Sequence, residues 1–536
     1  MTFSPSAHIV VIFMLKTSQG LVYPEETTFD YIGMIPENYI SNYEAAYLLL
    51  TSTHPANVSI YVPFLRSGAI EEFVLSSNET RKLQLDVTLR MPSESLVSRR
   101  AFLVKSTGAI SVVLLDKQLL NLDALQFMEL ESLGKRYTAF SFLDGLPGSF
   151  VAIAIPFEVT EIRVRLPSGV KPITVSVNGQ KVVIDPEINL TLNAYDAFQI
   201  TSPDDLTGTT VKSDKRVAMF AGHLRTNNRG GCLDHCLAQM YTTSDLGSKY
   251  IAFGYRKTGN EDTIRITSVY DKTSVMVNNE TALYLANSSL FEDVYLPGNA
   301  FYYIDADKPV QAGCIGVSSN PDPSMWLYTP LPFRCSSYVF TVPSVPGYTS
   351  AMKNDLVLIV DSAATEDIFL NGERVSPNWM NVTGSSYSGS YIPVSGVDTT
   401  FHVTHGQHVP FAVYVLSSLP CVSYAFRLVT CDNGTREVTF PEIEQDVLSE
   451  RVYFPINNVV VLKRHLNSRF DAYYGRKHST SDSQECLVIC LKYADCFGVN
   501  FAPVSLSGSH NCEILLTNEG VSLPSEDWDA HTIEGN

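Results

Sequence analysis

Short apolar runs of four to eight residues, rich in Val, Ile, Tyr and Phe, recur along most of the chain and predict β-strands. Clear examples are Val58–Val62, Val175–Val177, Val275–Val277 and Ile368–Leu370. Two of these runs lead into Asn-Gly, at 178–179 and at 371–372. Asn-Gly suits a tight hairpin turn because both residues tolerate positive φ. Few stretches have helical periodicity, so the sequence predicts a mainly β protein.

The strand pattern repeats along the chain. Residues Leu133–Phe140 match Leu246–Phe253 at an offset of 113 residues, and Ser337–Phe340 is a weaker third copy. A further apolar run closes each unit, at Ala109–Val113, Arg216–Phe220, Lys308–Ala312 and Val409–Tyr414. We expect about four β-sandwich-like units of roughly 90 to 115 residues, each long enough to hold a core of its own.

The pattern changes after about residue 440. The acidic stretch 441–449 is typical of a linker, and the segment 450–536 is denser in cysteine. Within it, residues 481–493 predict a short helix, which Asp482 caps with Glu485 three residues further on. Cys486 and Cys490 are four residues apart and would lie on one face of that helix.

The N-terminus predicts export. Residues 1–22 combine the apolar run Ala7–Leu15 with the small residues Ser18 and Gly20, as in a secretory signal peptide. The alternative is that this run is a first strand of the fold. No later segment offers ~18 consecutive apolar residues, and the polar tail carries no lipid-anchor signal. We therefore expect a soluble, secreted protein without a membrane span.

The cysteines and sequons favour the same compartment. Ten cysteines, an even number, suit disulfides in an oxidising environment. Proximity in sequence predicts the pairs Cys232–Cys236, Cys314–Cys335 and Cys421–Cys431, with Cys486, Cys490, Cys496 and Cys512 clustered in the C-terminal segment. Seven N-x-[ST] sequons predict a glycoprotein, at Asn57, Asn78, Asn189, Asn279, Asn287, Asn381 and Asn433.

Charge narrows the range of partners. The formal net charge is −18, from 56 acidic and 38 basic residues, so phosphate would be repelled and nucleic acid is not an expected partner. One local exception is a C-terminal basic stripe with interleaved tyrosines. We define it by Lys463, Arg464, Arg469, Tyr473, Tyr474, Arg476 and Lys477. It predicts binding of a sulfated or sialylated glycan, or of an acidic protein, and the alternative is an ordinary solvated face.

Two clusters contain metal-ligand residue types. Asp234 and His235 lie between Cys232 and Cys236, but no second pair has matching spacing. We favour a disulfide-closed loop in which Asp234 and His235 hold the backbone.

The histidines of the second cluster, at 402, 405 and 408, are spaced by three residues. That spacing fits neither one strand face nor a common zinc pattern. No G-x-S-x-G, H-E-x-x-H or P-loop motif occurs, so we expect no enzyme, no metal and no cofactor.

Several motifs between about residues 25 and 430 resemble the N-terminal domain of the IgGFc-binding protein family, whose members are secreted and associated with mucus and surfaces. These motifs are Val217–Gly222, Cys232–Met240, Leu246-Gly247, Asp322–Met325, Leu370–Gly372 with Trp379, and Gly406–His408. The Asp-His-x-x-x-Gln run is the most specific. The resemblance implies that residues 23–440 form one family region, and no residue marks an Fc site.

The spacing Cys486-x3-Cys490-x5-Cys496, followed by Cys512-Glu-Ile-Leu, resembles a PAN/apple module over residues 450–536. That family has a small sheet cradling one helix, so an α+β domain is implied. It also implies the bridges Cys486–Cys512 and Cys490–Cys496. The outer pair of familiar apple domains is absent from this sequence.

Together these features predict a secreted, non-catalytic recognition or adhesion protein that binds protein or carbohydrate. A structural component of mucus or matrix is the first alternative, and a secreted metal-dependent hydrolase is the second.

Overall fold

The computed structural model describes residues 28–38, 45–65, 69–118, 121–143, 148–226, 232–256, 261–318, 322–347 and 352–431, and short strands between 451 and 534. The chain divides into two compact parts, Met1–Arg436 and Glu437–Asn536, and we describe each by itself. The predicted signal peptide (1–22) and the predicted linker (441–449) lie outside the described residues. None of the helices in the described ranges has the length and apolar character of a membrane span.

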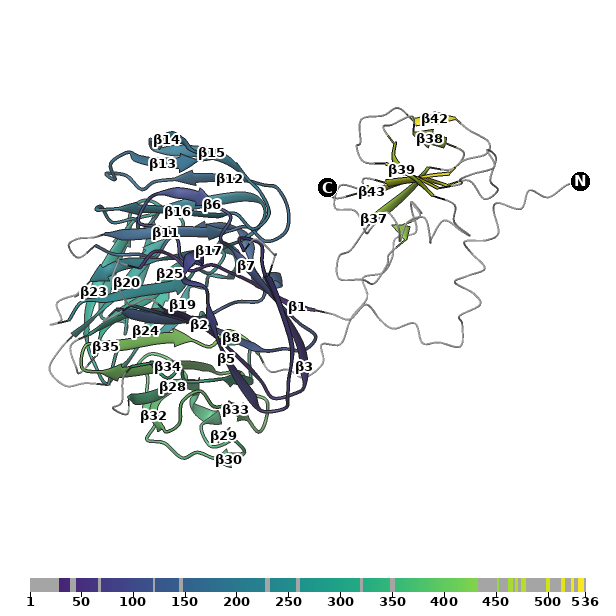
Figure 1. Cartoon of the computed structure of the whole chain (residues 1–536). Helices are drawn as coiled ribbons and strands as arrows, with labels where there is room; N and C mark the ends of the chain where they lie inside the picture. The colour runs from purple at the N-terminus through teal and green to yellow at the C-terminus, as the bar shows by residue number, and fades with distance from the viewer. Residues whose placement is uncertain are drawn as a thin grey trace, which may run out of the picture. The chain divides into compact units, whose positions relative to one another are not determined.

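The first part is built almost entirely from strands, and its sheets group into four units in chain order (Figure 1). Each unit has an outer and an inner layer of antiparallel strands, which is the arrangement of a β-sandwich. The prediction of a mainly β chain is confirmed, and so is the repetition of sandwich-like units. Figure 1 shows the units as successive purple, blue, teal and green groups.

Unit 1 has the outer order β1-β7-β3-β4 and the inner order β5-β2-β8-β9. Its strands are β1 (Phe29–Gly33), β2 (Ala45–Ser52), β3 (Ala56–Val62), β4 (Ala69–Leu75), β5 (Glu79–Leu85), β6 (Leu96–Ser98), β7 (Phe102–Ser106), β8 (Ser111–Lys117) and β9 (Leu122–Gln126). The 3₁₀ turns η2 (Val87–Leu89) and η3 (Leu130–Ser132) follow β5 and β9.

Unit 2 joins its two layers through one long strand. Its strands are β10 (Gly134–Thr138), β11 (Ser149–Ala154), β12 (Thr160–Arg165), β13 (Ile173–Val177), β14 (Gln180–Ile184), β15 (Glu187–Leu192), β16 (Ala197–Ser202), β17 (Thr210–Thr226) and β18 (Asp234–Gln239). The first part of β17 pairs with β10 and β12, and the second part pairs with β11 and β18. The short strand β6 of unit 1 adds to the same sheet beside β16.

Units 3 and 4 repeat the two-layer plan, with outer orders β19-β24-β21-β22 and β27-β33-β29-β30. Unit 3 has η4 (Thr243–Asp245), β19 (Lys249–Phe253), β20 (Glu261–Ser268), β21 (Thr273–Val277), β22 (Thr281–Leu285), β23 (Phe291–Pro297), β24 (Phe301–Ala306), β25 (Val310–Val317) and β26 (Pro323–Leu327). Unit 4 has β27 (Ser337–Phe340), β28 (Lys353–Asp361), η5 (Ser362–Ala364), β29 (Ile368–Leu370), β30 (Glu373–Arg374), β31 (Met380–Asn381), β32 (Tyr387–Val394), β33 (Phe401–His405), β34 (Ala412–Leu419) and β35 (Val422–Arg427). Their inner orders are β23-β20-β25-β26 and β31-β32-β28-β34-β35.

Four hydrophobic cores close these units into a ring. Each core combines the sandwich of one unit with inner-sheet residues of the next, and the fourth core brings Leu49, Val113 and Leu115 of unit 1 against unit 4. The inner strands are therefore covered on both faces. This is why β8, β25 and β34 are buried at every residue, whereas the outer strand β12 alternates between buried and exposed residues.

A buried tyrosine fastens the first strand of each unit to the closing strand of its inner sheet. Tyr31, Tyr137, Tyr250 and Tyr338 donate hydrogen bonds of 2.8, 2.7, 2.5 and 2.6 Å to the carbonyl oxygens of Ile110, Val217, Val310 and Phe411. The backbone N–H of Gly134 and that of Gly247 donate to the hydroxyls of Tyr137 and Tyr250. The repeated Leu-Gly-x-x-Tyr motif therefore encodes a structural contact.

Replacing Tyr250 with Phe is expected to lower the free energy of unfolding by about 1 to 3 kcal/mol, because the buried carbonyl of Val310 and the half-buried N–H of Gly247 lose their partner. The matched control is Tyr284→Phe in the same unit, since the Tyr284 side chain is 60% exposed. Chemical denaturation of both variants gives the comparison. Equal midpoints for the two would contradict the role of this hydrogen bond.

The Asn-Gly turns are confirmed. Asn178 and Gly179 have φ of 49° and 77°, and Asn371 and Gly372 have φ of 52° and 82°. Both pairs connect hairpin strands, β13–β14 and β29–β30. Positive φ at both central residues matches the right-handed twist of the flanking strands.

The second part contains antiparallel strands whose backbone pairing is described. They are β36 (Arg451–Val452), β37 (Val461–His465), β38 (Ser468–Phe470), β39 (Tyr474–His478), β40 (Gly498–Phe501), β41 (Cys512–Leu515), β42 (Ser522–Pro524) and β43 (Asp529–Glu534). Six of them form a sheet in the order β36-β37-β43-β40-β41-β39, and β38 pairs with β42. The predicted helix at 481–493 lies outside the described residues, so the PAN/apple assignment stays a prediction.

Candidate functional site

The four units meet along a central axis. The last inner strand of each unit, β9, β18, β26 or β35, contacts the corresponding strand of the units before and after it, and we call these the hub strands. The cavity between them measures only about 20 Å³. It is lined by Ala124–Gln126, Leu237–Gln239, Met325–Leu327 and Ala425–Arg427. This volume holds at most about one water molecule, so the axis is a packed core.

Three fully buried aspartates stand at the beginnings of the hub strands. Asp123 accepts hydrogen bonds from the backbone N–H groups of Ala124 (2.8 Å) and Leu237 (2.7 Å), and thereby links unit 1 to unit 2. Asp234 of unit 2 in turn accepts a hydrogen bond from the backbone N–H of Leu122 in unit 1, so the two units are linked twice. Asp234 also accepts from the backbone N–H of its neighbour His235. These carboxylates satisfy backbone donors where the strands of different units meet.

The third aspartate, Asp322, lies beside Asp234 and Ser423. The Ser423 hydroxyl is 3.2 Å from the backbone oxygen of Asp322 and 2.9 Å from the hydroxyl of Ser324. Burial raises the pKa of Asp234 well above its usual range, and the neighbouring Asp322 carboxylate raises it further. Burial also raises the pKa of Asp322, to about 6. The two carboxyl groups influence each other's titration, and Asp234 is the weaker acid of the pair.

The hub should make stability depend on pH. A carboxyl whose folded pKa is raised contributes stability below about pH 4, and this contribution is lost as the pH rises through about 6. We expect the free energy of unfolding to fall by roughly 1 to 3 kcal/mol between pH 4.5 and pH 7.5. Asp322→Asn, which stays neutral, should make this slope shallower in denaturation curves, while Asp123 and Asp234, whose pKa values burial also raises, keep the remaining part. An unchanged slope in Asp322→Asn would show that other groups carry the dependence.

The disulfides cross the molecule instead of joining neighbours in sequence. Cys232 pairs with Cys421, 189 residues away, at a Cα–Cα distance of 5.2 Å. Cys335 pairs with Cys431, 96 residues away, at 5.3 Å. The predicted pairs Cys232–Cys236, Cys314–Cys335 and Cys421–Cys431 are therefore wrong. Cys236 and Cys314 keep buried thiol groups in β18 and β25.

The disulfides join distant cysteines because the hub strands meet at the axis although they lie far apart along the chain. Cys232 precedes β18 of unit 2 and Cys421 precedes β35 of unit 4, so their bridge spans two units that are not consecutive. Cys236 lies within β18, and burial and three nearby carboxylates raise the pKa of its thiol well above the usual range. A thiol held protonated in this way is a poor nucleophile and a poor metal ligand.

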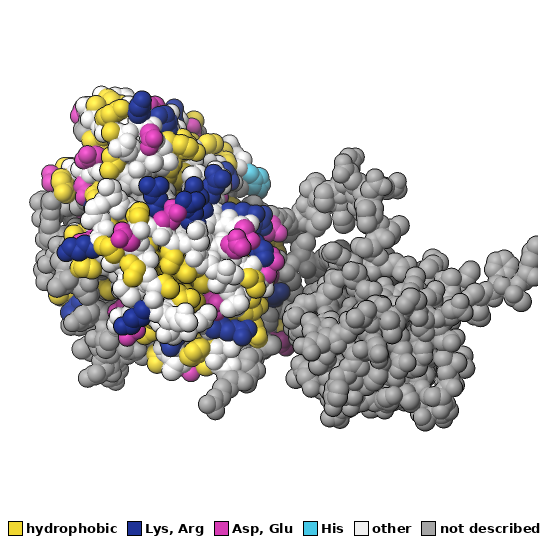
Figure 2. Space-filling view, turned by 90° about the horizontal axis from the view of Figure 1, so that it is seen from above, with side chains coloured by type: hydrophobic (Ala, Val, Ile, Leu, Met, Phe, Trp, Pro, Cys, Tyr) yellow, Lys and Arg dark blue, Asp and Glu magenta, His cyan; other side chains and the backbone are white. Residues whose placement is uncertain are grey.

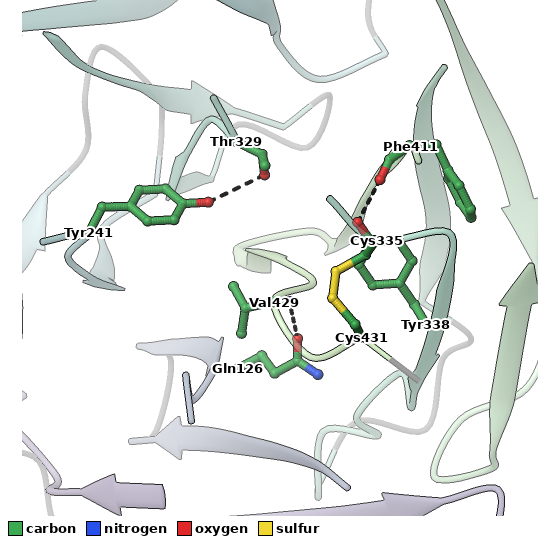
Figure 3. The surroundings of a disulfide bond; sticks show 8 residues. All are labelled: Gln126, Tyr241, Thr329, Cys335, Tyr338, Phe411, Val429 and Cys431. Carbon is green, nitrogen blue, oxygen red and sulfur yellow. Dashed lines mark hydrogen bonds between the residues drawn. A yellow bond between two sulfur atoms is a disulfide. The ribbon is translucent and has the colours of Figure 1, made fainter. Parts of the chain in front are cut away.

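The second disulfide lies at the seam where the ring closes (Figure 3). Cys431 follows the last hub strand and bonds Cys335 just before β27. The N–H of Val429 donates to the Gln126 side chain of unit 1 over 2.6 Å. Figure 3 shows both links, with the Tyr338–Phe411 hydrogen bond beside the bridge. The end of unit 4 is thus fixed to unit 1 and to its own first strand.

Asp234 and His235 both contact backbone groups, as the sequence predicted. The local disulfide that was predicted to close their loop is not formed. His235 is buried, stacks on Phe150 with ring centroids 5.6 Å apart, and lies 3.2 Å from the backbone oxygen of Leu224. Burial lowers its pKa. Within the described ranges, no group of three or more His, Cys, Asp or Glu side chains is arranged to hold a metal ion.

The side chains of two of the three histidines of unit 4 have separate partners. The His402 ring nitrogen is 2.9 Å from the Ser337 hydroxyl, and the His405 ring nitrogen is 2.8 Å from the Ala364 backbone oxygen. His408 occupies a turn with φ of 56°. The three histidines therefore have structural roles, His402 and His405 through hydrogen bonds and His408 through its place in a turn.

The C-terminal stripe is described only as backbone. Lys463 and Arg464 lie in β37, Arg469 in β38, and Tyr474, Arg476 and Lys477 in β39. β37 and β39 belong to one sheet and β38 to another. Tyr473 lies outside the described residues, and so do Cys486, Cys490 and Cys496. The stripe and the two bridges implied for this part stay predictions.

The asparagines of six sequons lie on the surface of the described body. Asn57, Asn78, Asn189, Asn279, Asn287 and Asn381 are all exposed. Asn433 lies outside the described residues. Exposure is what a glycosyl transfer acceptor requires, so each of the six stays a candidate for N-glycosylation.

Open depressions on the outer surface are much larger than the axial cavity. One of about 550 Å³ lies between units 3 and 4 and is lined by residues such as Arg256, Asn299 and Tyr391. Another of about 390 Å³ lies on the outer sheet of unit 2 and includes Arg163 and Lys212. Neither was anticipated from the sequence, because each collects residues from strands that are distant along the chain.

Comparison with known proteins agrees with the resemblance of the body. The family model described as IgGFc binding protein matches residues 123–417. A human (Homo sapiens) protein, "IgGFc-binding protein", is 22% identical over 401 residues, which cover 69% of this chain and 7% of that protein. The chain therefore corresponds to a small fraction of the length of this relative.

Proposed function

Because the chain belongs to the IgGFc-binding protein family, we propose that it is a secreted, non-catalytic recognition protein that binds protein or carbohydrate outside the cell. The observation that carries this proposal is the ring itself. Its axis is filled, its buried carboxylates bond backbone groups, and two long-range disulfides fasten its units. Such a body offers partners a rigid outer surface, on which loops and side chains are held in fixed positions.

The family name of the human relative describes binding to an antibody region, and that property is not transferred here. In our proposal the PAN/apple-like segment 450–536 adds a second binding surface through its basic stripe. Long-range disulfides support an oxidising compartment, since cytosolic thiols are kept reduced. The exposed sequons support passage through the secretory route.

The test is a binding screen with the full secreted chain on arrays of glycans and on cell surfaces. A second protein carries Lys463→Ser, Arg464→Ser, Arg469→Ser, Arg476→Ser and Lys477→Ser. We expect selective, saturable binding by the full chain, which weakens with added salt if cations carry it. Absence of selective binding combined with concentration-dependent self-association would overturn recognition in favour of a structural matrix role.

A further inference from the structure

Three basic side chains stand side by side on the solvent face of unit 2. Arg136 of β10 is the register partner of Lys212 in β17, and Lys212 is the partner of Arg163 in β12. All three residues are exposed. Neighbouring strands are ~4.8 Å apart, so the three positions span about 10 Å. We call these three residues the cationic row, and Asn189 of β15 extends it beyond Arg163.

The row lies within a wider basic face of a chain whose net charge is −18. Further exposed cations on the same strands are Lys135, Arg165 and Arg216. Figure 2 looks onto the end of the body where β12 to β15 lie in Figure 1, and Lys and Arg side chains gather there among fewer Asp and Glu.

Like charges on directly opposed residues of a sheet destabilise it. The row contains two such neighbouring pairs. One acid, Glu187, bonds Arg163 at 2.6 Å. Its pKa is lowered first by the hydrogen bond from Arg163 and further by the charges of Arg163, Arg165 and Lys212. Three acids, Glu161, Glu187 and Asp214, stand against the six exposed cations Lys135, Arg136, Arg163, Arg165, Lys212 and Arg216, which leaves an excess of positive charge for an external anion.

The depression beside the row indicates which anion fits. It has a volume of about 390 Å³ and is lined by Glu161–Arg163, Asn189–Thr191 and Lys212–Asp214. Sulfate groups accept hydrogen bonds from Arg and Lys, whereas sugar hydroxyls donate to carboxylates such as those of Glu161 and Asp214. The acidic side chains of a polyacidic peptide can pair only with the cations of this surface, whereas a sulfated polysaccharide also brings hydroxyl donors for the two carboxylates.

We propose that the cationic row and its depression bind a sulfated polysaccharide. This inference rests on the proposed recognition function and names a ligand class and a surface for it. The row supplies the sulfate contacts, and Glu161, Asp214, Ser213 and Thr191 supply contacts for hydroxyl groups.

The same surface contains the asparagine of a sequon. Asn189 belongs to a sequon, is exposed, and lines the depression. An N-glycan attached there covers the row, so the glycosylated chain and the chain lacking this glycan differ in access to the ligand. The Asn189→Gln variant, produced by secretion, is therefore the parent protein for the test.

The probe is heparin immobilised at low and at physiological salt, with chemically desulfated heparin, which keeps its uronate carboxylates, as the counterpart without sulfate groups. On the Asn189→Gln background, the triple variant Arg136→Ser/Arg163→Ser/Lys212→Ser is expected to bind at least about tenfold more weakly, from three surface charge contacts. The matched control is Lys171→Ser/Lys181→Ser/Lys353→Ser, which removes three exposed cations elsewhere. Thermal unfolding midpoints verify that all variants are folded.

Five outcomes decide between these possibilities. A selective loss in the row variant, together with weaker binding to desulfated heparin, supports the proposal. Equal binding by the row variant and its parent overturns it, as does the absence of heparin binding by the parent. Tighter binding of polyglutamate than of heparin overturns it in favour of an acidic protein. If the parent does not bind heparin but the glycan array shows another selective ligand, the proposed recognition function is supported and the sulfate-binding site is not.

Discussion

Replacing Cys232 and Cys421 with Ser is expected to lower the free energy of unfolding by roughly 4 to 5 kcal/mol, since the bridge closes a very long loop in the unfolded chain. The separation of 189 residues makes the loss of chain entropy large, and the bridge joins hub hairpins of units 2 and 4. Denaturant titration of the double variant against the parent measures the effect.

The Cys236→Ala variant separates this bridge from the sequence-local alternative. Cys236 keeps a thiol in the structure, so its replacement should cost only the packing of one small side chain. If Cys232 were instead bonded to Cys236, Cys236→Ala would release a reactive thiol at Cys232 and destabilise the chain as much as Cys232→Ser does. That outcome would contradict the cross-hub connection.

Removing Arg265 is expected to cost about 2 to 4 kcal/mol, because the variant leaves two half-buried carboxylates and a backbone oxygen without their cation. The Arg265 side chain is 5% exposed and bonds both oxygens of Asp293, at 2.7 and 2.8 Å. It also reaches Asp205 of unit 2 at 2.7 Å and the backbone oxygen of Ser141 at 2.8 Å. One guanidinium group thus joins β20 of unit 3 to unit 2.

Arg374→Ala is the matched control for Arg265→Ala. The Arg374 side chain is 51% exposed and pairs with Glu366 and Asp367 at the surface. Surface pairs of this kind contribute about 0 to 1 kcal/mol. Arg265→Lys should recover part of the stability, because an ammonium group keeps the charge and loses the two-pronged bond to Asp293. A loss in Arg265→Ala no greater than that of Arg374→Ala would show that the network is dispensable.

Strand positions were accessible to sequence reasoning because they are local. Runs such as Ile368–Leu370 and the turn Asn178-Gly179 carry their own backbone preferences, and both appear where they were expected. The Leu-Gly-x-x-Tyr repeat revealed the units because each copy makes the same buried hydrogen bond. The joining of layers through β17 was not predicted, since a long strand and two short ones have the same apolar pattern.

The contacts around the axis could not be read in the same way. Asp123, Asp234 and Asp322 come from three units and meet only because the ring closes, so their positions along the chain give no hint of proximity. The wrong disulfide pairs have the same cause. Two of the family motifs, Cys232–Met240 and Asp322–Met325, include residues of the hub strands β18 and β26, and a third, Val217–Gly222, pairs with β18. A side chain on Gly222, for example, would collide with the backbone oxygen of Cys236.

The cationic row depends on register in a similar way. Arg136, Arg163 and Lys212 are separated by up to 76 positions in the sequence, and strand pairing alone makes them neighbours. Alternation in Glu161–Arg165 and Lys212–Arg216 shows which residues face solvent, yet it does not show which strands are adjacent. The stripe at 463–477 was found more easily because its members are close in sequence.

The cross-hub disulfides are tested most directly by disulfide mapping of the non-reduced protein, with free thiols alkylated beforehand and the proteolytic peptides identified by mass spectrometry. A ring fastened by these two disulfides predicts linked peptides that contain Cys232 with Cys421 and Cys335 with Cys431. It also predicts that Cys236 and Cys314 are alkylated only after the protein is unfolded. Recovery of a Cys232–Cys236 peptide, or of alkylated Cys232 and Cys421 in the native protein, would contradict it.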